Sequence, residues 1–514
     1  MQKYNSLSYF IVTIAFIVLT ILVIRGILKN NKRLQLAIVG VKRRENELAY
    51  FPRYCSSRAI ICYVLTLVMV SCANIGHLLP FQFMLFGLIA IISFFTYSSK
   101  ITRHWHKFDP HRFVNKLFIV SLFIRIVYVV FIYYYYTEMT GKPHMYHAGD
   151  SLWYKNMATV WPEEGFEAFL ESMANYADLS DSGYCWWLGF EFSLFGTDVL
   201  PSRIIKCVID SFSCILIYSL ARRNFGENTA RMAAVFYMLM PNTWYYCGVT
   251  LKETEMTFIG IMFVERGDMA LRSSKIKLKD LLVPLLAIAI MLTFRTSTAA
   301  VMLASLVVAL VLSSKKQLQT WKKVVLTFFI GVWMVATVGV ELREEAQALW
   351  EGKVDNQESG YRARSNVEEG GNSFAQYATT TLFAPLVFTI PFSTMVDVPG
   401  QENQMMLNGA NFIKNVVSIF VIFAMVILLI RREWRNSVLP IAFMGGYLVV
   451  LVFSNFAHSE RFHFPALGFE LMFAAFGVSQ LTNKHKRWYN IWLVIVCVAN
   501  IAWTMIKLKG KGLA

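Results

Sequence analysis

The run FVNKLFIVSLFIRIVYVVFIYYYY, residues 113–136, decides the fold class of this chain. It is long enough for a helix to cross the hydrocarbon core of a bilayer, which takes roughly 20 residues. Similar apolar runs recur along the whole sequence, beginning at Leu7. Backbone polar groups in lipid must be satisfied within their own segment, so each run has to be helical. The sequence therefore predicts an all-α polytopic membrane protein.

The composition agrees with this class, because 56% of the 514 residues are hydrophobic and only 16% are charged. We expect a bundle of about 13–14 transmembrane helices. The predicted spans are 7–25, 59–79, 81–98, 113–136, 203–221, 230–248, 253–266, 280–295, 298–313, 323–341, 412–430, 437–454, 464–482 and 490–507.

The net charge of +16 reflects membrane topology and does not indicate a nucleic-acid partner. Lys and Arg gather in short loops, which marks those loops as cytoplasmic, and they would also attract anionic membrane lipids. In contrast, the segment from Glu138 to Asp198 carries ten carboxylates and two lysines. We therefore expect the long loops on the outer side, with both chain termini there. This pattern fits a multi-pass protein of a bacterial inner membrane whose site faces the periplasm.

Four parts are predicted along the chain. Residues 1–112 form N-terminal transmembrane helices with basic cytoplasmic loops, and 113–341 form a catalytic module that includes outer loop 137–202 with short amphipathic helices. Residues 342–411 form a second outer loop, and 412–514 form the C-terminal transmembrane helices. Within the second loop, prolines interrupt the apolar stretch 374–395, which favours a helix along the interface or one that dips into the membrane and returns.

Chemistry is expected in the first outer loop and in the turn at 250–253. Asp150, beside the membrane, would act as a general base that takes the proton of an acceptor hydroxyl; a solvated carboxylate is the alternative. Lys252 and Glu253 stand at the edge of a span, where charges often mark a substrate path or simply end a helix. Glu253 would orient a donor or acceptor group.

Several outer cations suit a phosphate group. Arg295 and Arg461 end or begin spans on the outer side, and guanidinium binds phosphate oxygens bidentately, although a single Arg there can also snorkel to headgroups. With Lys252, they would neutralise a phosphate leaving group. His463 and Tyr154, in the segments around Arg461 and Asp150, complete the expected substrate-binding set.

A divalent cation is an open alternative. His144, His147 and Asp150 have the spacing H-x-x-H-x-x-D, which would bring three ligands together on a helix. Pro143 and Gly149 disfavour a regular helix there, so we assign no metal ligand.

The order of motifs carries a resemblance. Gly149-Asp150, Gly183-Tyr184, and Phe195-Gly196 precede Leu220-Ala221-Arg222-Arg223-Asn224-Phe225-Gly226 and Gly248-Val249-Thr250-Leu251-Lys252-Glu253. Over about residues 120–300, this order resembles the C-type (GT-C) integral-membrane glycosyltransferases of the glycosyltransferase family 39 kind. That family includes protein O-mannosyltransferases and lipid A aminoarabinose transferases.

The resemblance implies a polyprenyl-phosphate-linked sugar donor, inverting transfer on the outer face, and a lipid, glycan or protein acceptor. It matches Asp150 to the acidic residue of the family's first outer loop, and Glu253 to a Leu-x-x-Glu-like turn. Where the family usually has an acidic pair, this chain has Asp150-Ser151, and its first three helices are additional.

Two other functions fit a bundle of this kind. A polymerase of lipid-linked polysaccharide repeat units would use arginines of a long outer loop, such as Arg362 and Arg364. A transporter or flippase of lipid-linked glycans would place charges inside the membrane, where Arg125 and Asp210 fall, unless these two pair to tie helices together.

Overall fold

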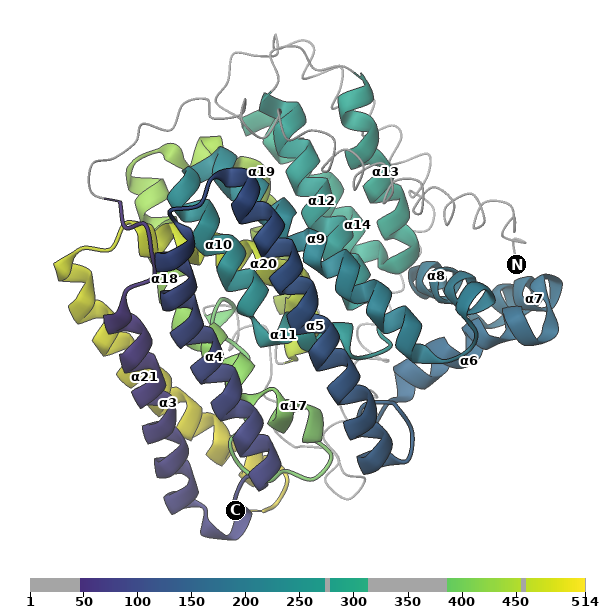
Figure 1. Ribbon diagram of the computed structural model, residues 1–514, viewed down its shortest axis with the longest axis horizontal. Helices are drawn as coiled ribbons and strands as arrows, with labels where there is room; N and C mark the ends of the chain where they lie inside the picture. Colours follow the sequence, from purple (N-terminus) through teal and green to yellow (C-terminus); the bar gives the residue numbers. More distant parts are fainter. Residues whose placement is uncertain (1–46, 273–277, 313–385, 454–458, 514) are drawn as a thin grey trace.

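The computed structural model describes residues 47–272, 278–312, 386–453 and 459–513, and within these ranges it contains α-helices and no named strand (Figure 1). The predicted all-α class is confirmed. Seven of the described helices are long and apolar enough to cross a membrane, and three shorter apolar helices accompany them. The chain is a multi-pass membrane protein. The predicted spans 7–25 and 323–341 lie outside the described residues.

The membrane bundle is built from twelve segments of the described chain. These are α3 (Arg53–Ala73), α4 (Phe81–Trp105), α5 (Pro110–Thr140), α9 (Val199–Phe225), α10 (Glu227–Leu239) with α11 (Pro241–Cys247), α12 (Glu253–Arg272), α13 (Leu278–Phe294), α14 (Thr296–Leu312), α18 (Asn408–Ile430), α19 (Val438–Phe453), α20 (Glu460–Ser479) and α21 (Asn483–Gly510). Short 3₁₀ turns, η1 (Ile75–His77) and η4 (Glu433–Asn436), join α3 to α4 and α18 to α19.

Local sequence sets the two ends of α5. The Asp109 carboxylate accepts from the Arg112 N–H at 2.9 Å, and Pro110 occupies the first helical position, where no N–H is needed. Gly141 ends the helix with φ 73°, a left-handed conformation that favours glycine. The long apolar helix therefore ends at this glycine, and the chain continues into loop 137–202.

The prediction of one continuous helix over 230–248 is wrong. The helix stops at Leu239, Met240 is extended, and a new helix, α11, begins at Pro241. Proline lacks the N–H that the preceding turn would bond, and its ring disfavours helical backbone at the residue before it. The predicted span 59–79 also shifts, because α3 begins at Arg53 and ends at Ala73.

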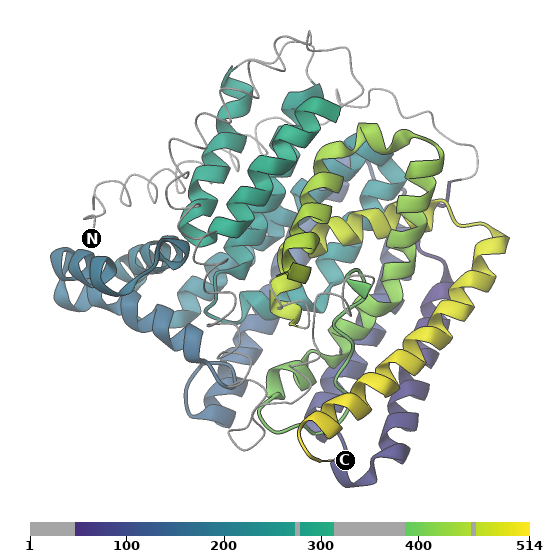
Figure 2. The ribbon, with the colours of Figure 1, turned by 180° about the vertical axis from the view of Figure 1, so that it is seen from behind.

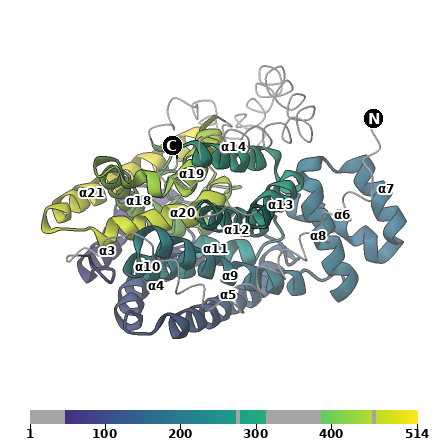
Figure 3. The same cartoon turned by 90° about the horizontal axis from the view of Figure 1, so that it is seen from above.

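The first outer loop folds as three helices, α6 (Gly149–Glu164), α7 (Phe166–Tyr176) and α8 (Leu179–Phe195), as expected for loop 137–202. Figure 3 shows them gathered at one side of the bundle, away from α3 and α21. α8 packs against α6 and α13, and almost all of its side chains from Ser182 to Phe192 are buried. The helices of this loop are thus an integral, packed part of the fold.

Hydrogen bonds between turns define two ends of the bundle. At one end, which we call the basic end, Arg231 donates to three carbonyl oxygens of the α4–α5 turn, and Arg431 donates to Gln480. At the other, the site end, His147 bonds Glu402 of α17 (Glu402–Met406), and Lys507 near the C-terminus donates to Gln401. The basic turn between α4 and α5 and the basic turn after α18 therefore lie at the same end of the bundle, away from α6–α8.

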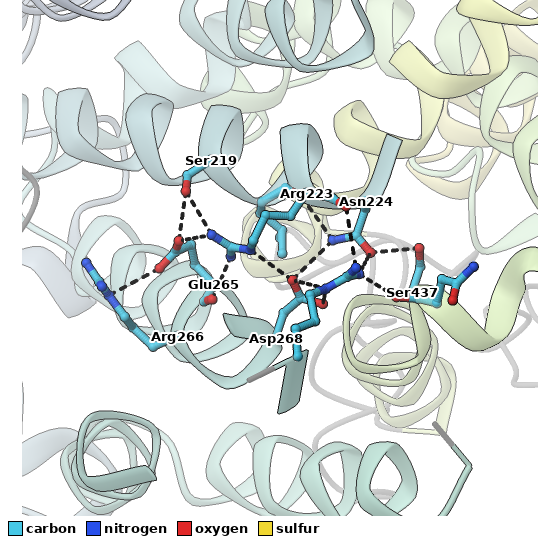
Figure 4. Close-up of polar contacts among 10 residues, drawn as sticks. Ser219, Arg223, Asn224, Glu265, Arg266, Asp268 and Ser437 are labelled. Atoms are coloured by element: carbon cyan, nitrogen blue, oxygen red, sulfur yellow. Dashed lines mark hydrogen bonds and ion pairs between the residues drawn. The ribbon is translucent and has the colours of Figure 1, made fainter. Parts of the chain in front are cut away.

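A buried ion-pair network joins α9, α12 and α19 at the basic end (Figure 4). Arg223 forms ion pairs with Glu265 and with Asp268, the latter at 3.1 Å. Arg272 bonds Asp268 at 2.9 Å and reaches the Asn436 carbonyl oxygen at 2.6 Å, just before α19. α12 therefore runs from Glu253 at the site end to an anchored terminus at the basic end.

The proline-containing stretch before α18 is not an interfacial helix where it is described. Residues 386–401 form no more than a single turn, lie largely buried, and run beside α18 and α21 (Figure 2). Asn415 donates to the Pro391 carbonyl oxygen at 2.9 Å, and the Ser393 N–H donates to Asn500 at 2.7 Å. Non-helical backbone is tolerated at such depth because protein side chains satisfy its polar groups. Residues 374–385 lie outside the described ranges.

The N-terminal helices belong to the same packed bundle, since α4 packs against α10 and α18 while α3 packs against α21. α18 and α20 approach each other closely at Gly477. A Cβ there would lie 2.0 Å from the Phe420 carbonyl oxygen, so only glycine fits. Small residues allow such backbone contact between membrane helices. The four-part division of the chain stays a prediction.

Candidate functional site

Three charged residues from distant parts of the chain meet at the site end. The Arg461 guanidinium, at the start of α20, donates through Nε to Glu253 at the start of α12 and through an Nη atom to Asp150 at the start of α6. Both contacts are ion pairs. The two carboxylates that the sequence singles out are therefore joined by one cation.

These carboxylates differ sharply in exposure. The Glu253 side chain is 1% exposed and the Asp150 side chain 61%, whereas Arg461 between them is 18% exposed. Glu253 thus lies on the buried side of Arg461, and Asp150 lies on its solvent-exposed side. An open carboxylate can reach a substrate, but a buried one acts on the site through the cation that it holds.

A second ion pair forms beside the first. Lys252 lies at the end of the turn before α12, and its ammonium bonds Asp181 of α8 and the Phe294 carbonyl oxygen, the latter at 2.6 Å. The Tyr154 hydroxyl donates to the same Asp181 carboxylate. Burial of Asp181 opposes its ionisation, but Lys252 and the two hydrogen bonds outweigh burial and lower the pKa of Asp181. Asp181 is therefore anionic and fixed.

These groups surround a cavity of about 480 Å³ at the site end. It is lined by Asp150, Trp153, Tyr154, Tyr176, Asp178, Ser180, Asp181, Lys252, Arg295, Arg461 and Phe462. Carboxylates stand on its α6 and α8 walls, and three cations stand on the walls made by the bundle. A cavity of this size, with opposed charges at its walls, suits a polar ligand that carries both an anionic group and hydroxyls.

Arg295 lies at the break between α13 and α14, with its guanidinium over the Phe462 ring at 4.8 Å from the ring centre. The Tyr447 hydroxyl of α19 donates to the Phe462 carbonyl oxygen at 3.0 Å. The aromatic ring thus holds Arg295 against the cavity beside Arg461. The structure therefore brings Asp150, Tyr154, Lys252, Arg295 and Arg461 to one cavity, with Glu253 directly behind it.

His463 does not join them. It is 2% exposed and its ring bonds the Lys414 ammonium of α18 at 2.6 Å. Glu470 lies 3.8 Å from the same ammonium. The helical period explains the difference: Arg461 and His463, two residues apart on α20, face different directions. His463 belongs to a buried cluster between α18 and α20.

The spacing His144, His147, Asp150 does not gather three ligands. His144 is buried and bonds the Ser151 hydroxyl at 3.0 Å, His147 bonds Glu402 at 2.8 Å, and Asp150 bonds Arg461. The loop bends between the two histidines, since His147 has φ 50°. Throughout the described ranges, no group of three His, Cys, Asp or Glu side chains is placed to hold a metal ion.

Asp181 is the charged cavity residue with a direct bond to a predicted site residue that sequence reasoning missed. It lies near the N-terminus of α8 in the segment Asp178-Leu179-Ser180-Asp181, where an acidic residue is ordinary for a first helical turn. Nothing in the sequence indicates that Lys252, 71 residues away, bonds it. Of the tryptophans in this loop, Trp153 lines the cavity, whereas Trp186 is fully buried within the packing of α6–α8.

A second hollow is apolar. It has a volume of about 650 Å³ and opens between α4 and α5, which diverge from their shared turn (Figure 1). Ser93 and Phe131 line its sides, and Trp244 of α11 and Ala410 of α18 line its floor. α4 and α5, which form its sides, are both long and apolar enough to cross a membrane.

Comparison with protein families gives two matches. Residues 183–340 match the model of the dolichyl-phosphate-mannose-protein mannosyltransferases, and residues 406–509 match the model of the Alg9-like mannosyltransferase family. The two matches indicate a membrane glycosyltransferase of the GT-C type. No curated protein and no solved structure matches it.

The two matched segments contribute different residues to the site. Lys252, Glu253 and Arg295 come from the first segment and Arg461 from the second, whereas Asp150 and Asp181 precede both. The ion pair between Arg461 and Glu253 therefore joins the two segments.

The residues that a transporter would use do not line a pathway. Arg125 and Asp210 are both fully buried and form an ion pair at 2.6 Å between α5 and α9. Tyr237 also donates to Asp210 at 2.6 Å, and Arg125 donates to Thr243 at 3.0 Å. The pair ties helices together, which was the other interpretation of these charges. Arg362 and Arg364, expected for a polymerase, lie outside the described residues.

Proposed function

We propose that this protein transfers a sugar from a polyprenyl-phosphate donor to a hydroxyl group of a lipid, glycan or protein acceptor. The observation that carries the proposal is the junction of Asp150, Arg461 and Glu253 at a polar cavity that also holds Arg295 and Lys252. An open carboxylate beside several cations provides the two functions that such a transfer needs, a base and a site for the departing phosphate.

In the proposed reaction, the acceptor oxygen forms a bond to the anomeric carbon of the sugar as the bond from that carbon to the phosphate oxygen breaks. The acceptor proton passes to the Asp150 carboxylate, and the bonding electrons leave with the polyprenyl phosphate. Asp150 suits this role because its side chain is more than half exposed, although Arg461 bonds one of its oxygens. Attack from the side opposite the phosphate inverts the anomeric configuration.

Arg295, Arg461 and Lys252 would stabilise the phosphate as its charge increases. Guanidinium groups bind phosphate oxygens through paired N–H donors, and donors that are already in place need no reorganisation during the reaction. Arg295 is held over Phe462, and Lys252 is fixed by Asp181 and by carbonyl oxygens. Glu253 does not line the cavity. We therefore propose that it positions Arg461.

The apolar groove between α4 and α5 suits the hydrocarbon chain of the donor. Its lining is almost wholly apolar and it lies within the spans, where a polyprenyl chain would reside. Met406 lines the groove, and the Tyr136 hydroxyl donates to its sulfur at 3.5 Å. A donor bound here would keep its chain in lipid while its phosphate reached the polar cavity.

We place the site on the non-cytoplasmic side, the periplasmic face of a bacterial inner membrane. The support is the positive-inside rule, because the turns that carry Arg103, Arg222, Arg272 and Arg431 all lie at the opposite, basic end. Asn156→Cys introduces a single cysteine at an exposed position of α6. Its labelling by a membrane-impermeant reagent tests this placement. Labelling only from the cytoplasmic side would overturn it.

Both family descriptions name mannose, so a polyprenyl-phosphate-linked mannose is the first donor to test. The protein in lipid nanodiscs should convert this donor, or another polyprenyl-phosphate sugar, to polyprenyl phosphate when acceptor-containing membranes are added. Mass analysis of the lipid follows the conversion. Donor lipids that all retain their sugar, in the presence of envelope acceptors, would contradict the proposal and would favour a transporter.

A further inference from the structure

Two cations on one turn of α9 hold the chain segments that lead to Asp150 and to Glu253. Arg203 and Lys206 are three residues apart, which places them on the same face of the helix. Each is 1% exposed. Neither lines the polar cavity.

Lys206 bonds the turn that precedes Glu253. Its ammonium donates to the Val249 carbonyl oxygen at 3.0 Å and to the Leu251 carbonyl oxygen. This turn lies between α11 and α12 and is buried, and no backbone N–H of the described residues donates to the carbonyl oxygens of Val249 or Leu251. A buried carbonyl group without a partner is costly, so Lys206 fixes the shape of the turn.

Arg203 connects that turn to the first outer loop. Its guanidinium donates to the Pro143 carbonyl oxygen and, at 3.3 Å, to the Thr250 hydroxyl. Pro143 precedes His144, which bonds Ser151 in the first turn of α6. One side chain therefore contacts both the segment that leads to Asp150 and the turn that leads to Glu253.

We propose that Arg203 and Lys206 are positioning residues, which set the placement of Asp150 relative to Lys252 and Glu253. The inference rests on the proposed transferase function and adds to it two residues that touch neither substrate nor reacting atoms. Without these two cations, the segment that leads to Asp150 and the turn that leads to Glu253 would no longer be bonded to the same helix. A displacement of about 1 Å at reacting groups can lower a rate about 100-fold.

The test compares two buried cations of α9. Lys206→Met removes the contacts to the turn and leaves Glu255, 3.6 Å away, without its cation. Arg223→Met is the matched control, because it also removes a buried α9 cation from acidic partners on α12, but at the basic end. We expect Lys206→Met to lower kcat about 100-fold with little change in the donor KM, and Arg223→Met to keep kcat within about threefold.

A second variant separates positioning from simple loss of stability. Lys206→Met/Glu255→Gln also removes the carboxylate that lost its ion pair, so thermal stability should recover toward that of the wild type. The carbonyl groups of Val249 and Leu251 still lack their donor, so kcat should stay low. Recovery of kcat together with stability would overturn the proposal, as would an equal loss of kcat in Arg223→Met.

Hydrogen exchange provides a readout that needs no activity. Amides of residues 249–253 should exchange about tenfold faster in Lys206→Met than in the wild type, whereas Arg223→Met should affect residues 265–272. Unchanged exchange at 249–253 would contradict the positioning role even in an active enzyme. If the wild-type protein transfers no sugar, the proposed function fails while the exchange result still decides whether Lys206 orders this turn.

Discussion

The Arg461 guanidinium bonds the Glu253 carboxylate across 208 residues of sequence and joins the starts of α20 and α12 at the cavity. Glu253 is almost fully buried, so it relies on Arg461 to balance its charge. Arg461 also bonds the exposed Asp150. This single pair therefore contributes to the stability of the bundle and to the placement of the proposed base.

Replacing Arg461 should lower both the stability of the protein and its transfer activity, and a double variant separates the two effects. Arg461→Met should destabilise the protein by about 3–5 kcal/mol, because it leaves a buried carboxylate unpaired. In Arg461→Met/Glu253→Gln, most of that stability should return while transfer activity stays at least about 100-fold below the wild type. Thermal unfolding in detergent and donor turnover in nanodiscs measure the two effects. A double variant with wild-type turnover would exclude Arg461 from phosphate stabilisation.

Replacing Asp150 should affect activity and leave the fold intact. Asp150→Asn keeps the size of the side chain but removes the proton acceptor, so kcat should fall about 10²–10⁴-fold. Its exposed position predicts little change in melting temperature. Glu164→Gln, at the exposed end of α6, is the control and should turn over normally. Normal turnover by Asp150→Asn would show that another group takes the proton.

Filling the apolar groove should weaken donor binding. Ser93→Trp would place an indole ring in the groove, so we expect the donor KM to rise about tenfold while kcat changes little. The neighbouring Ile92 is 47% exposed and does not line the groove, so Ile92→Trp is a matched control that should behave as the wild type. Kinetics with donors of different chain length provide the measurement. Equal KM values for the two variants would place the chain elsewhere.

Low pH should destabilise the native protein at His144, which bonds Ser151 in the first turn of α6. Burial, followed by the charges of Arg203, Lys155 and Lys142, lowers the pKa of His144 from 6.5 to about 4. The unfolded chain therefore binds a proton at this residue below pH 6.5, while the native protein resists until about pH 4. The contribution of His144 to stability is complete above pH 6.5 and declines as the pH falls toward 4.

His144→Asn should remove that part of the acid dependence, so its melting temperature should change less than that of the wild type between pH 6.5 and 4. His104→Asn, on the exposed basic end of α4, should keep the wild-type slope. Melting temperatures measured across this range in one detergent provide the comparison. Identical slopes for the wild type and His144→Asn would assign the acid sensitivity to other groups.

Local patterns were enough to predict the fold class and most of the helices. Apolar length defines a span without reference to its neighbours, because lipid requires each segment to bond its own backbone. The same reasoning failed at Met240–Pro241, where one apolar run forms two helices, and in the described part of the stretch before α18. There, Asn415 and Asn500 satisfy an extended backbone, and nothing in the apolar pattern shows that they are near.

For the site, the sequence alone determined which charged residues stand at the ends of spans, since charges there are costly unless they have a function or a partner. Lys252, Glu253, Arg295 and Arg461 follow from that rule, whereas Asp150 follows from its place in loop 137–202 and from the family resemblance. Only the tertiary structure decided their partners: Asp181 for Lys252, Glu253 for Arg461, and Lys414 for His463. Charge interactions depend on distance in space, and helices far apart in the chain set those distances by packing.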